Sequence, residues 1–436
     1  MGALQYIVEG GRSLKSGAAI QPSGNKNAAL PIIAAALLTE HPVTLSNVPR
    51  IRDVEVLVQL VRSLGVHVDW KGGDQNTLEI HAKSVTAAQL DPELCRRIRA
   101  SILLVAPVLA RCGEIRLPPP GGDVIGRRRL DTHFLALEAL GAKVEFMDML
   151  HLSTKGLRGA DVFLDEPSVT ATENAVTAAA AAKGTTILRN AACEPHVQDL
   201  CRFLVTLGAK IDGIGTNQLT IEGGRALGGG THRIGPDHIE VGSFIAVAAV
   251  TKSDLRIKNA GVEHLRSTLL GFERLGIACR AEGDDLVVPA QQKREIEPDL
   301  GGHVPKIEDQ PWPAFPADTM SVAIVTATQC SGMVMVHEKM FESRLFFVDK
   351  LTAMGARIVL CDPHRAIVSG PTKLRGATVE SPDIRAGMAM LVAALCADGV
   401  STIRNIGQIE RGYERIDERL NALGARITRE EDRGTR

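Results

Sequence analysis

The chain has 436 residues, of which 44% are hydrophobic and 23% charged, with a formal net charge of -1. This length predicts two or three domains, each large enough to bury its own core. The near-zero charge argues against a nucleic-acid partner, because binding to phosphates requires a basic surface. Aromatic residues make up only 3%, so we expect a core of closely packed Ala, Val, Ile and Leu.

Several features predict a cytoplasmic protein that does not enter a membrane. The longest apolar runs, 31–38 and 101–110, are shorter than the roughly 18–20 residues that a membrane span needs. The N-terminus lacks a basic region followed by an apolar stretch, so we expect no secretory signal. The eight cysteines show no paired spacing, which indicates reduced thiols. The histidines form no metal-binding array, and we expect no metal site.

A sixfold repeat is the strongest feature of the sequence. A glycine that follows a helix-like pattern and precedes a strand-like run recurs six times, at intervals of 67 to 79 residues. Such a glycine is typical of a helix that ends and leads into a strand. The six segments are LGVHV (64–68), LGAKV (140–144), LGAKI (207–211), LGIAC (275–279), MGARI (354–358) and LGARI (423–427).

Each repeat also contains an Ala-rich segment that is apolar nearly all round, which predicts a fully buried helix. Amphipathic patterns such as 54–63 and 197–206 predict surface helices, and runs such as 185–191 and 401–406 predict strands. A repeat is therefore expected to consist of a buried helix, a strand, a surface helix and a strand. The six Ala-rich segments are 27–38, 99–110, 172–183, 241–252, 320–329 and 385–396.

Six repeats divide naturally into two α/β domains of three repeats each. We place one domain at 23–235 and the other at 1–22 plus 236–436, with the Gly-rich stretch 225–237 at the boundary. The N-terminal strand would then join the C-terminal half. A cleft between two such domains is the expected place for a ligand.

Polar and charged residues gather at the starts of the predicted buried helices. One interpretation is that they are ordinary helix caps. Lys and Arg, however, are poor caps and repel the positive end of the helix dipole, so their presence also suggests an anion bound at the helix N-terminus. These residues are Lys26, Asn27, Arg99, Asp318, Asp383 and Arg385.

The stretch 117–134 is the most distinctive local feature, because PPPGG is followed by GGDVIG around Asp123 and by arginines at 127, 128 and 129. It is either a solvated basic loop or a mobile flap that brings an acid and a cation over an anionic ligand. Arg344 and Arg411 lie in later segments, where they could equally begin ordinary surface helices.

Eight motifs, in order along the chain, resemble those of the enolpyruvyl transferases, and among them the type that uses UDP-N-acetylglucosamine (UDP-GlcNAc). The likeness extends from about residue 7 to residue 427. GNKN, PAFPAD and RGYER are specific when they occur together. The motifs are GNKNAALP (24–31), RASI (99–102), LPPPGGDVIGRRRLDTH (117–133), SVTATEN (168–174), PAFPAD (313–318), FESR (341–344), DIRAG (383–387) and RGYER (411–415).

The resemblance implies two inside-out α/β domains of three repeats, with buried helices and an active site in the interdomain cleft. It also implies a transferase reaction. The sugar 3-hydroxyl adds to phosphoenolpyruvate, and a tetrahedral intermediate then loses phosphate, as the first committed step of peptidoglycan synthesis. No cofactor, metal, nucleic acid, membrane or obligate protein partner is implied. The alternatives are the same chemistry on another nucleotide or sugar acceptor, and a non-catalytic UDP-sugar-binding protein.

The resemblance also assigns roles to residues of this chain. Asp123, Asp318 and Lys26 would be catalytic, with Asp318 as the base that faces the sugar hydroxyl. Arginines suit the two anionic groups of phosphoenolpyruvate, which Lys26, Arg128, Arg344, Arg385 and Arg411 would bind. UDP-GlcNAc would contact Asn27, Arg99, Arg128, Arg129, Leu130, Asp131, Thr132, Ser168, Val169, Asp318 and Met340.

Four positions depart from the family pattern. Asp123 replaces the usual flap cysteine, which is the target of fosfomycin, so the resemblance implies resistance to that antibiotic. Because a carboxyl group ionises at lower pH than a thiol, we expect an activity optimum below neutral pH. Arg129 replaces a proline, Thr170 replaces a glycine, and Glu166 stands where a basic residue can contact the diphosphate. These three changes bear on the identity of the acceptor.

Overall fold

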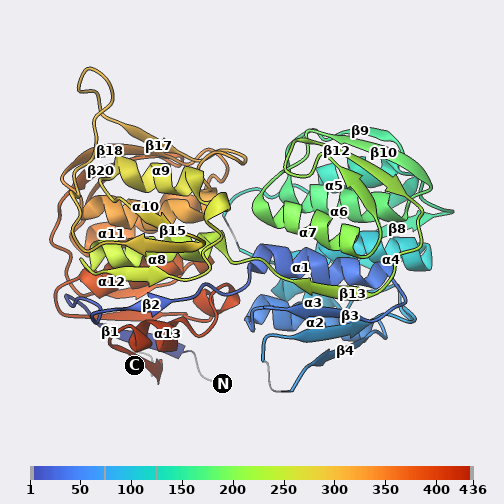
Figure 1. The fold of residues 1–436 in the computed structure, drawn as a ribbon, viewed down its shortest axis with the longest axis horizontal. Coiled ribbons are helices and arrows are strands. Elements are labelled where there is room, and N and C mark those ends of the chain that lie inside the picture. Colours follow the sequence, from blue (N-terminus) through green and yellow to red (C-terminus); the bar gives the residue numbers. More distant parts are fainter. Residues whose placement is uncertain (1–3, 73–74, 124, 147, 433–436) are drawn as a thin grey trace. The chain divides into compact units, whose positions relative to one another are not determined.

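The computed structural model describes residues 4–72, 75–123, 125–146 and 148–432. Their contacts divide the chain into two compact units (Figure 1). Unit 1 takes the described residues of 1–23, 124–127 and 236–436, and unit 2 takes those of 24–123 and 128–235. Ser23 lies with unit 1 because its backbone N–H donates to Oε2 of the buried Glu240 at 2.6 Å.

Unit 2 is built around helices that contact one another inside a shell of sheets. Helices α1, α4 and α6 form this centre together with the 3₁₀ helix η2, and an aliphatic core surrounds them. Its helices are α1 (Lys26–Ala35), η1 (Ala36–Leu38), α2 (Arg52–Ser63), α3 (Pro92–Arg97), η2 (Arg99–Leu104), α4 (Val105–Cys112), α5 (Asp131–Ala139), α6 (Val169–Ala181) and α7 (Pro195–Thr206). Its strands are β3 (Val43–Ser46), β4 (His67–Trp70), β5 (Leu78–His81), β6 (Glu114–Leu117), β7 (Ala142–Phe146), β8 (Leu150–Thr154), β9 (Asp161–Phe163), β10 (Gly184–Arg189), β11 (Lys210–Asp212), β12 (Gln218–Gly223) and β13 (Gly230–Arg233).

Unit 1 repeats this plan with α8, α10 and α12, which contact one another at its centre (Figure 1). All 13 residues of α8 are buried. Its helices are α8 (His238–Val250), η3 (Val262–His264), α9 (Arg266–Arg274), α10 (Ala317–Thr328), η4 (Arg344–Phe347), α11 (Val348–Ala353), α12 (Ile384–Cys396), η5 (Ile409–Arg411) and α13 (Ile416–Ala422). Its strands are β1 (Leu4–Glu9), β2 (Ala19–Ile20), β14 (Leu255–Ile257), β15 (Arg280–Glu282), β16 (Asp285–Val288), β17 (Lys306–Glu308), β18 (Gly332–His337), β19 (Arg357–Asp362), β20 (Arg365–Gly370), β21 (Thr378–Glu380), β22 (Val400–Arg404) and β23 (Ile427–Glu431).

The sheets show the same repeat as the sequence. Each four-stranded sheet has one parallel pair and two antiparallel pairs, as in the order β17-β18-β20-β19. The sheet β6-β8-β7 has only three strands. In place of the parallel strand found in the other sheets, Gln89 forms a single parallel bridge with Arg116 of β6. β1 lies between β22 and β23 and pairs antiparallel with both, so the N-terminal strand completes a sheet of the C-terminal repeat.

The predicted fold class is therefore confirmed: two α/β units, each with three repeats and buried Ala-rich helices. The six repeat glycines lie directly after the C-cap residues of the surface helices, and all six have positive φ angles, between 74° and 107°. A residue with a side chain rarely adopts this conformation, which explains the glycine in each repeat. Among the described helices, none combines the length and apolar character needed to cross a membrane.

The second repeat differs from the predicted continuous helix over 99–110, because its first six residues form the 3₁₀ helix η2. The side chain of Asn174 donates to Ile102 O at 2.9 Å and accepts from Ala106 N at 3.4 Å. These two backbone groups would bond to each other in an α-helix. Pro107 also lacks an N–H group, so it cannot donate the α-helical hydrogen bond to the carbonyl of Leu103.

We predict that Gly208→Ala destabilises unit 2 through backbone strain alone. The φ angle at Gly208 is 107°, and the nearest atom to a new Cβ would be Ala226 O at 3.7 Å, so space is available. The expected loss is about 1–2 kcal/mol, which lowers the thermal midpoint by about 2–4 °C per kcal/mol in a domain of this size. Gly228→Ala is the control, because its φ is not positive and its new Cβ would also be unobstructed. Equal midpoints for the two variants in calorimetry would contradict this explanation.

Candidate functional site

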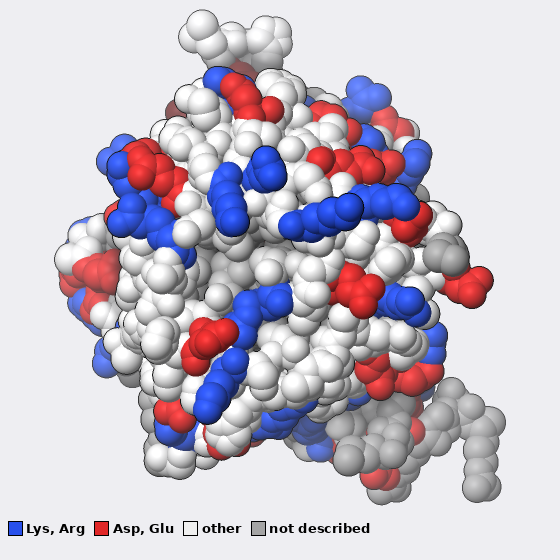
Figure 2. Space-filling view, turned by 90° about the vertical axis from the view of Figure 1, so that its right-hand side faces the viewer, with Lys and Arg blue, Asp and Glu red and all other residues white. Residues whose placement is uncertain are grey.

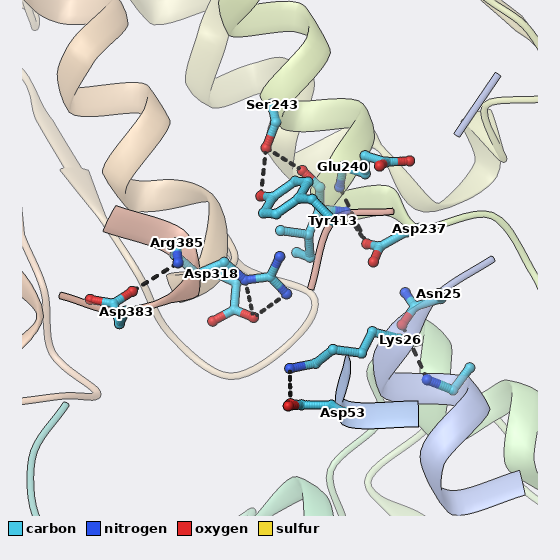
Figure 3. Close-up of polar contacts among 12 residues, drawn as sticks. Asn25, Lys26, Asp53, Asp237, Glu240, Ser243, Asp318, Asp383, Arg385 and Tyr413 are labelled. Atoms are coloured by element: carbon cyan, nitrogen blue, oxygen red, sulfur yellow. Dashed lines mark hydrogen bonds and ion pairs between the residues drawn. The ribbon is translucent and has the colours of Figure 1, made fainter. Parts of the chain in front are cut away.

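Lys26 occupies the first position of α1 in unit 2, directly after the true helix cap. Asn25 is the cap, because its side chain accepts a hydrogen bond from Ala28 N at 3.1 Å. Nζ of Lys26 lies 3.2 Å from Oδ2 of Asp53 in α2, and both side chains are largely buried (Figure 3). Asn27 follows and is half-buried. The cation at this helix start is thus held by a carboxylate from the neighbouring surface helix.

The base of the predicted flap packs tightly against the start of the second repeat. Gly121 N donates to Cys95 O at 2.9 Å, and a Cβ on Gly121 would lie 1.8 Å from Arg96 O. The glycine at 121 is therefore required by close packing, whereas the sequence suggested freedom of movement. Asp123 follows in the same unit and is half-buried.

The three consecutive arginines after the flap are divided between the units. Arg127 belongs to unit 1, where its N–H donates to Oε2 of Glu342 at 3.2 Å. Arg128 and Arg129 belong to unit 2, where Nη2 of Arg99 donates to Arg128 O at 2.7 Å. Burial, together with the charge of Arg128, lowers the pKa of Arg99 to about 10.

Asp165 links the start of α5 to the start of α6. Its Oδ2 accepts from Nη2 of Arg129 at 3.0 Å, and its Oδ1 accepts from Oγ1 of Thr132 at 2.6 Å. Nε of Arg129 also contacts Asp131 at 3.3 Å. Arg129 therefore enters a local charge network with two aspartates, instead of presenting an uncompensated positive charge. Leu130 begins this turn as the N-cap residue of α5.

His133 orients the hydroxyl group of Thr170. Asn174 donates to Nδ1 of His133 at 2.9 Å, so the ring proton is on Nε2, which donates to Oγ1 of Thr170 at 3.1 Å. Burial, and secondarily Arg99, lowers the pKa of His133 to about 3, which keeps the ring neutral. Thr170 stands next to Val169, the first residue of α6, and Ser168, its N-cap.

The best-defined group in unit 1 is a carboxylate held by two buried arginines. Asp318 lies in the first turn of α10, with 27% of its side chain exposed, whereas Arg344 and Arg385 are 4% and 5% exposed. Nη2 of Arg344 donates to Oδ1 of Asp318 at 2.9 Å. Nε and Nη2 of Arg385 lie 3.0 and 2.9 Å from Oδ2 (Figure 3).

The charges of this group are strongly coupled. Burial alone would lower the pKa of each arginine, but the negative charges around them raise it above the usual value. Asp383 caps α12 by accepting from the backbone N–H groups of Arg385 and Ala386 at 2.8 and 2.9 Å. The guanidinium of Arg385 also lies over the ring of Tyr413, at 5.5 Å from its centroid.

The remaining predicted residues of unit 1 lie in loops or short helices. Arg411 ends η5, and its Nη1 donates to Oε1 of Gln408 at 2.9 Å. Met340 is 36% exposed, and its N–H donates to Oε1 of Glu338. The structure thus brings Asp318, Arg344 and Arg385 into direct contact, while Arg411 and Met340 are placed by other partners.

In unit 2 the predicted residues fall into two groups. Lys26 and Asn27 lie at the start of α1. In the larger group, Arg99 donates to the backbone of Arg128, and Asp165 accepts hydrogen bonds from both Arg129 and Thr132.

Sequence reasoning missed Asp53 and Asp165. Asp53 stands in the first turn of an amphipathic helix, as acidic residues often do, so its sequence carries no distinguishing signal.

On the face shown in Figure 2, the distribution of charges agrees with the balanced composition. Figure 2 shows Lys and Arg interspersed with Asp and Glu over the face in view, without a large area of one sign. Among the described residues, no group of three or more His, Cys, Asp or Glu side chains could hold a metal ion.

Known proteins match the chain over nearly its whole length. The family model for EPSP synthase (3-phosphoshikimate 1-carboxyvinyltransferase) matches residues 8–420. A UDP-N-acetylglucosamine 1-carboxyvinyltransferase of Bradyrhizobium diazoefficiens is 71% identical over 99% of this chain and 100% of its own length. A protein of the same name from Treponema denticola is 54% identical over 97% of this chain and 98% of its own.

Solved structures show the same fold. The enolpyruvyl transferase NikO from Streptomyces tendae superposes with a TM-score of 0.86 at 25% identity, covering 98% of this chain and 99% of that one. The EPSP synthase of Acinetobacter baumannii has a TM-score of 0.73 at 17% identity, covering 98% of this chain and 100% of its own, and supports the fold alone. Given matches of this length and identity, the chain belongs to the enolpyruvyl (carboxyvinyl) transferase family.

Proposed function

We propose that this chain transfers the enolpyruvyl group of phosphoenolpyruvate to the 3-hydroxyl of UDP-GlcNAc and releases phosphate. The observation that carries the proposal is the 71% identity, over 99% of the chain, to a UDP-N-acetylglucosamine 1-carboxyvinyltransferase. The two relatives that share this name favour UDP-GlcNAc over the alternative acceptors, and a catalytic role over binding alone. The departures at Arg129, Glu166 and Thr170 then belong to details of acceptor binding.

Asp318 is the base of the proposed reaction. As the oxygen of the sugar 3-hydroxyl bonds to the central carbon of phosphoenolpyruvate, its proton passes to Asp318, and Asp123 protonates the methylene carbon. The new methyl group of the tetrahedral intermediate then returns a proton to Asp123, which restores the double bond as the bond to phosphate breaks, and the departing phosphate takes the proton held by Asp318. The two arginines that hold Asp318 fix the direction of its carboxylate, and such positioning is a large part of acid–base catalysis.

The anionic groups of phosphoenolpyruvate require several cations. We propose that these cations are the side chains of Lys26, Arg128, Arg344, Arg385 and Arg411. Arginine binds phosphate and carboxylate through two parallel hydrogen bonds. Lys26 supports this assignment because it stands at the first position of α1, where the helix N-terminus also attracts an anion, and because Asp53 at 3.2 Å holds its ammonium group in place.

We assign the UDP-GlcNAc contacts to residues from both groups of unit 2 together with two residues of unit 1. The arrangement around Asp165 fixes Arg129 and Thr132 at the start of α5, and His133 fixes Thr170 beside the N-terminus of α6. A helix N-terminus favours a negatively charged ligand. The proposed contacts are Asn27, Arg99, Arg128, Arg129, Leu130, Asp131, Thr132, Ser168, Val169, Asp318 and Met340.

The proposal involves two substrates and no cofactor. We place the reaction in the cytoplasm, which is supported by eight cysteines that form no disulfide in the described part of the chain.

Phosphate release from phosphoenolpyruvate tests the proposed function directly. We expect release that depends on UDP-GlcNAc, measured with a coupled phosphate assay. Calorimetric binding of UDP-GlcNAc without phosphate release would instead indicate a binding protein. Release that begins only with a different nucleotide sugar would indicate another acceptor.

We predict that Asp318→Asn reduces kcat by about 10²–10⁴-fold, the usual contribution of a general base. The amide keeps the shape of the side chain but accepts no proton at neutral pH. Calorimetry should show that UDP-GlcNAc still binds. Asp299→Asn, at an exposed hairpin position, is the matched control and should retain full activity. A similar loss in the control, or none at Asp318, would refute the assigned base.

We predict that phosphate release is insensitive to fosfomycin and that Asp123→Cys confers sensitivity. The thiol supplies the nucleophile that the antibiotic alkylates, and a carboxylate at this position is not attacked in the same way. Because a thiol ionises at higher pH than a carboxyl group, the optimum pH of Asp123→Cys should also be higher than that of the wild type. Inhibition of the wild-type enzyme by fosfomycin would overturn the role given to Asp123.

A further inference from the structure

Two acidic side chains lie behind the Asp318 group, at the ends of neighbouring parallel strands of unit 1. β17 and β18 pair so that Glu308 lies opposite His337. The next residues along each strand, Asp309 and Glu338, therefore follow at the same edge of the sheet. Both are fully buried, with 0% exposure. Neither has a place in the roles assigned to substrate binding or chemistry.

Each carboxyl group has one oxygen bound to the backbone and one without a donor. Oδ1 of Asp309 accepts from Lys339 N at 2.5 Å, and Oε1 of Glu338 accepts from Phe341 N at 3.1 Å. Apart from the contact between the two side chains themselves, Oδ2 of Asp309 and Oε2 of Glu338 have no hydrogen-bond partner among the described residues. Two ionised carboxylates only accept hydrogen bonds, so this contact requires a proton between them.

The surroundings of the pair favour the proton on Glu338. Burial raises the pKa of Glu338 far above its ordinary range, and the neighbouring Asp309 raises it further, while Arg344 opposes the shift. A buried pair of carboxyl groups that share one proton is the usual result when two like charges are held together. Glu338 is then a neutral acid that donates to Asp309.

The guanidinium of Arg344 lies between Glu338 and Asp318, but of the two it bonds only to Asp318. Nε of Arg344 lies 3.7 Å from Oε2 of Glu338, too far for a hydrogen bond, whereas Nη2 of the same guanidinium donates to Asp318 at 2.9 Å. His364 contacts the backbone oxygen of Glu338 at 2.7 Å, not its carboxyl group. Arg344 in turn is acted on by the charges of Asp318, Arg385 and Asp383.

An ionised Glu338 would compete with Asp318 for the same guanidinium, because a buried charge pair is far stronger than a contact with a neutral acid. We propose that Glu338 is a positioning residue, and that the proton it shares with Asp309 keeps Arg344 directed at Asp318. The positioning role rests on the proposed function, since it is defined by the reaction in which Asp318 acts.

Three variants test this arrangement. Glu338→Gln imitates the neutral acid, because its amide can donate to Asp309, and kcat should fall by no more than about threefold. Asp309→Asn supplies an amide donor and removes the negative charge beside Glu338. Both changes favour the ionised form of Glu338, which draws Arg344 away from Asp318, so kcat should fall about tenfold or more. The double variant has no carboxylate in the pair and should recover most of the lost activity.

The recovery separates this proposal from a merely structural role. If the pair only filled space, the double variant would be at least as impaired as Asp309→Asn, because the two disruptions would add. That result, or full activity in Asp309→Asn, would overturn the proposal. Glu308→Gln is the matched control, since Glu308 precedes Asp309 and contacts the surface lysines Lys306 and Lys339. This control should retain wild-type activity.

Infrared difference spectroscopy reports the shared proton without any turnover. The wild-type protein and Glu308→Gln should show the carbonyl stretch of a buried protonated carboxyl group at neutral pH, and Glu338→Gln and Asp309→Asn should both lack it. A wild-type protein that releases phosphate but lacks this band overturns the inference alone. A wild-type protein that shows the band but releases no phosphate with UDP-GlcNAc overturns the proposed function, and with it the positioning role, while the shared proton stands.

Discussion

The burial of helices without a polar face governs the whole structure. In each unit the central helices present Ala, Val, Ile and Leu in every direction, and all 13 residues of α8 are buried. Such helices must be enclosed on all sides, so sheets and surface helices form the outer layer of each unit. The charged residues of the candidate site meet the central helices at their ends, and a polar side chain along a central helix, such as Asn174 in α6, is buried and needs partners from neighbouring elements.

The residues of the candidate site follow from this constraint. Lys26 stands at the first position of α1, Asp318 in the first turn of α10, and Arg385 in the first turn of α12. At these ends the backbone N–H groups and the helix dipole favour negative charge. The cations among these residues would be unfavourable alone, and Asp53 and Asp318 compensate them. In each unit, the candidate residues are thus balanced charges at otherwise apolar helix ends.

The same principle extends to residues behind the site. A buried arginine needs a negative partner, and Arg344 has Asp318 at 2.9 Å, with the acid Glu338 at 3.7 Å behind it. In unit 2, the buried amide of Asn174 occupies the backbone groups of Ile102 and Ala106 and also contacts His133. Asn174 bonds to residues of the preceding repeat and so links separate parts of the chain, whereas Asp318, Glu338 and Arg344 lie within one repeat.

The amino-acid sequence by itself determined the repeat, the class of fold and the family. The six glycines, the apolar helices and the strands that follow them depend on local preferences: glycine at positive φ, apolar residues on every face, and β-branched residues in strands. The motifs likewise indicated Lys26, Asp123, Asp318 and the arginines. Only the tertiary structure decided which charges meet, such as Lys26 with Asp53, Arg129 with Asp165, and Glu338 with Asp309. These partners are distant in sequence or stand on different elements, and a contact between them depends on how the elements pack, which no local pattern encodes.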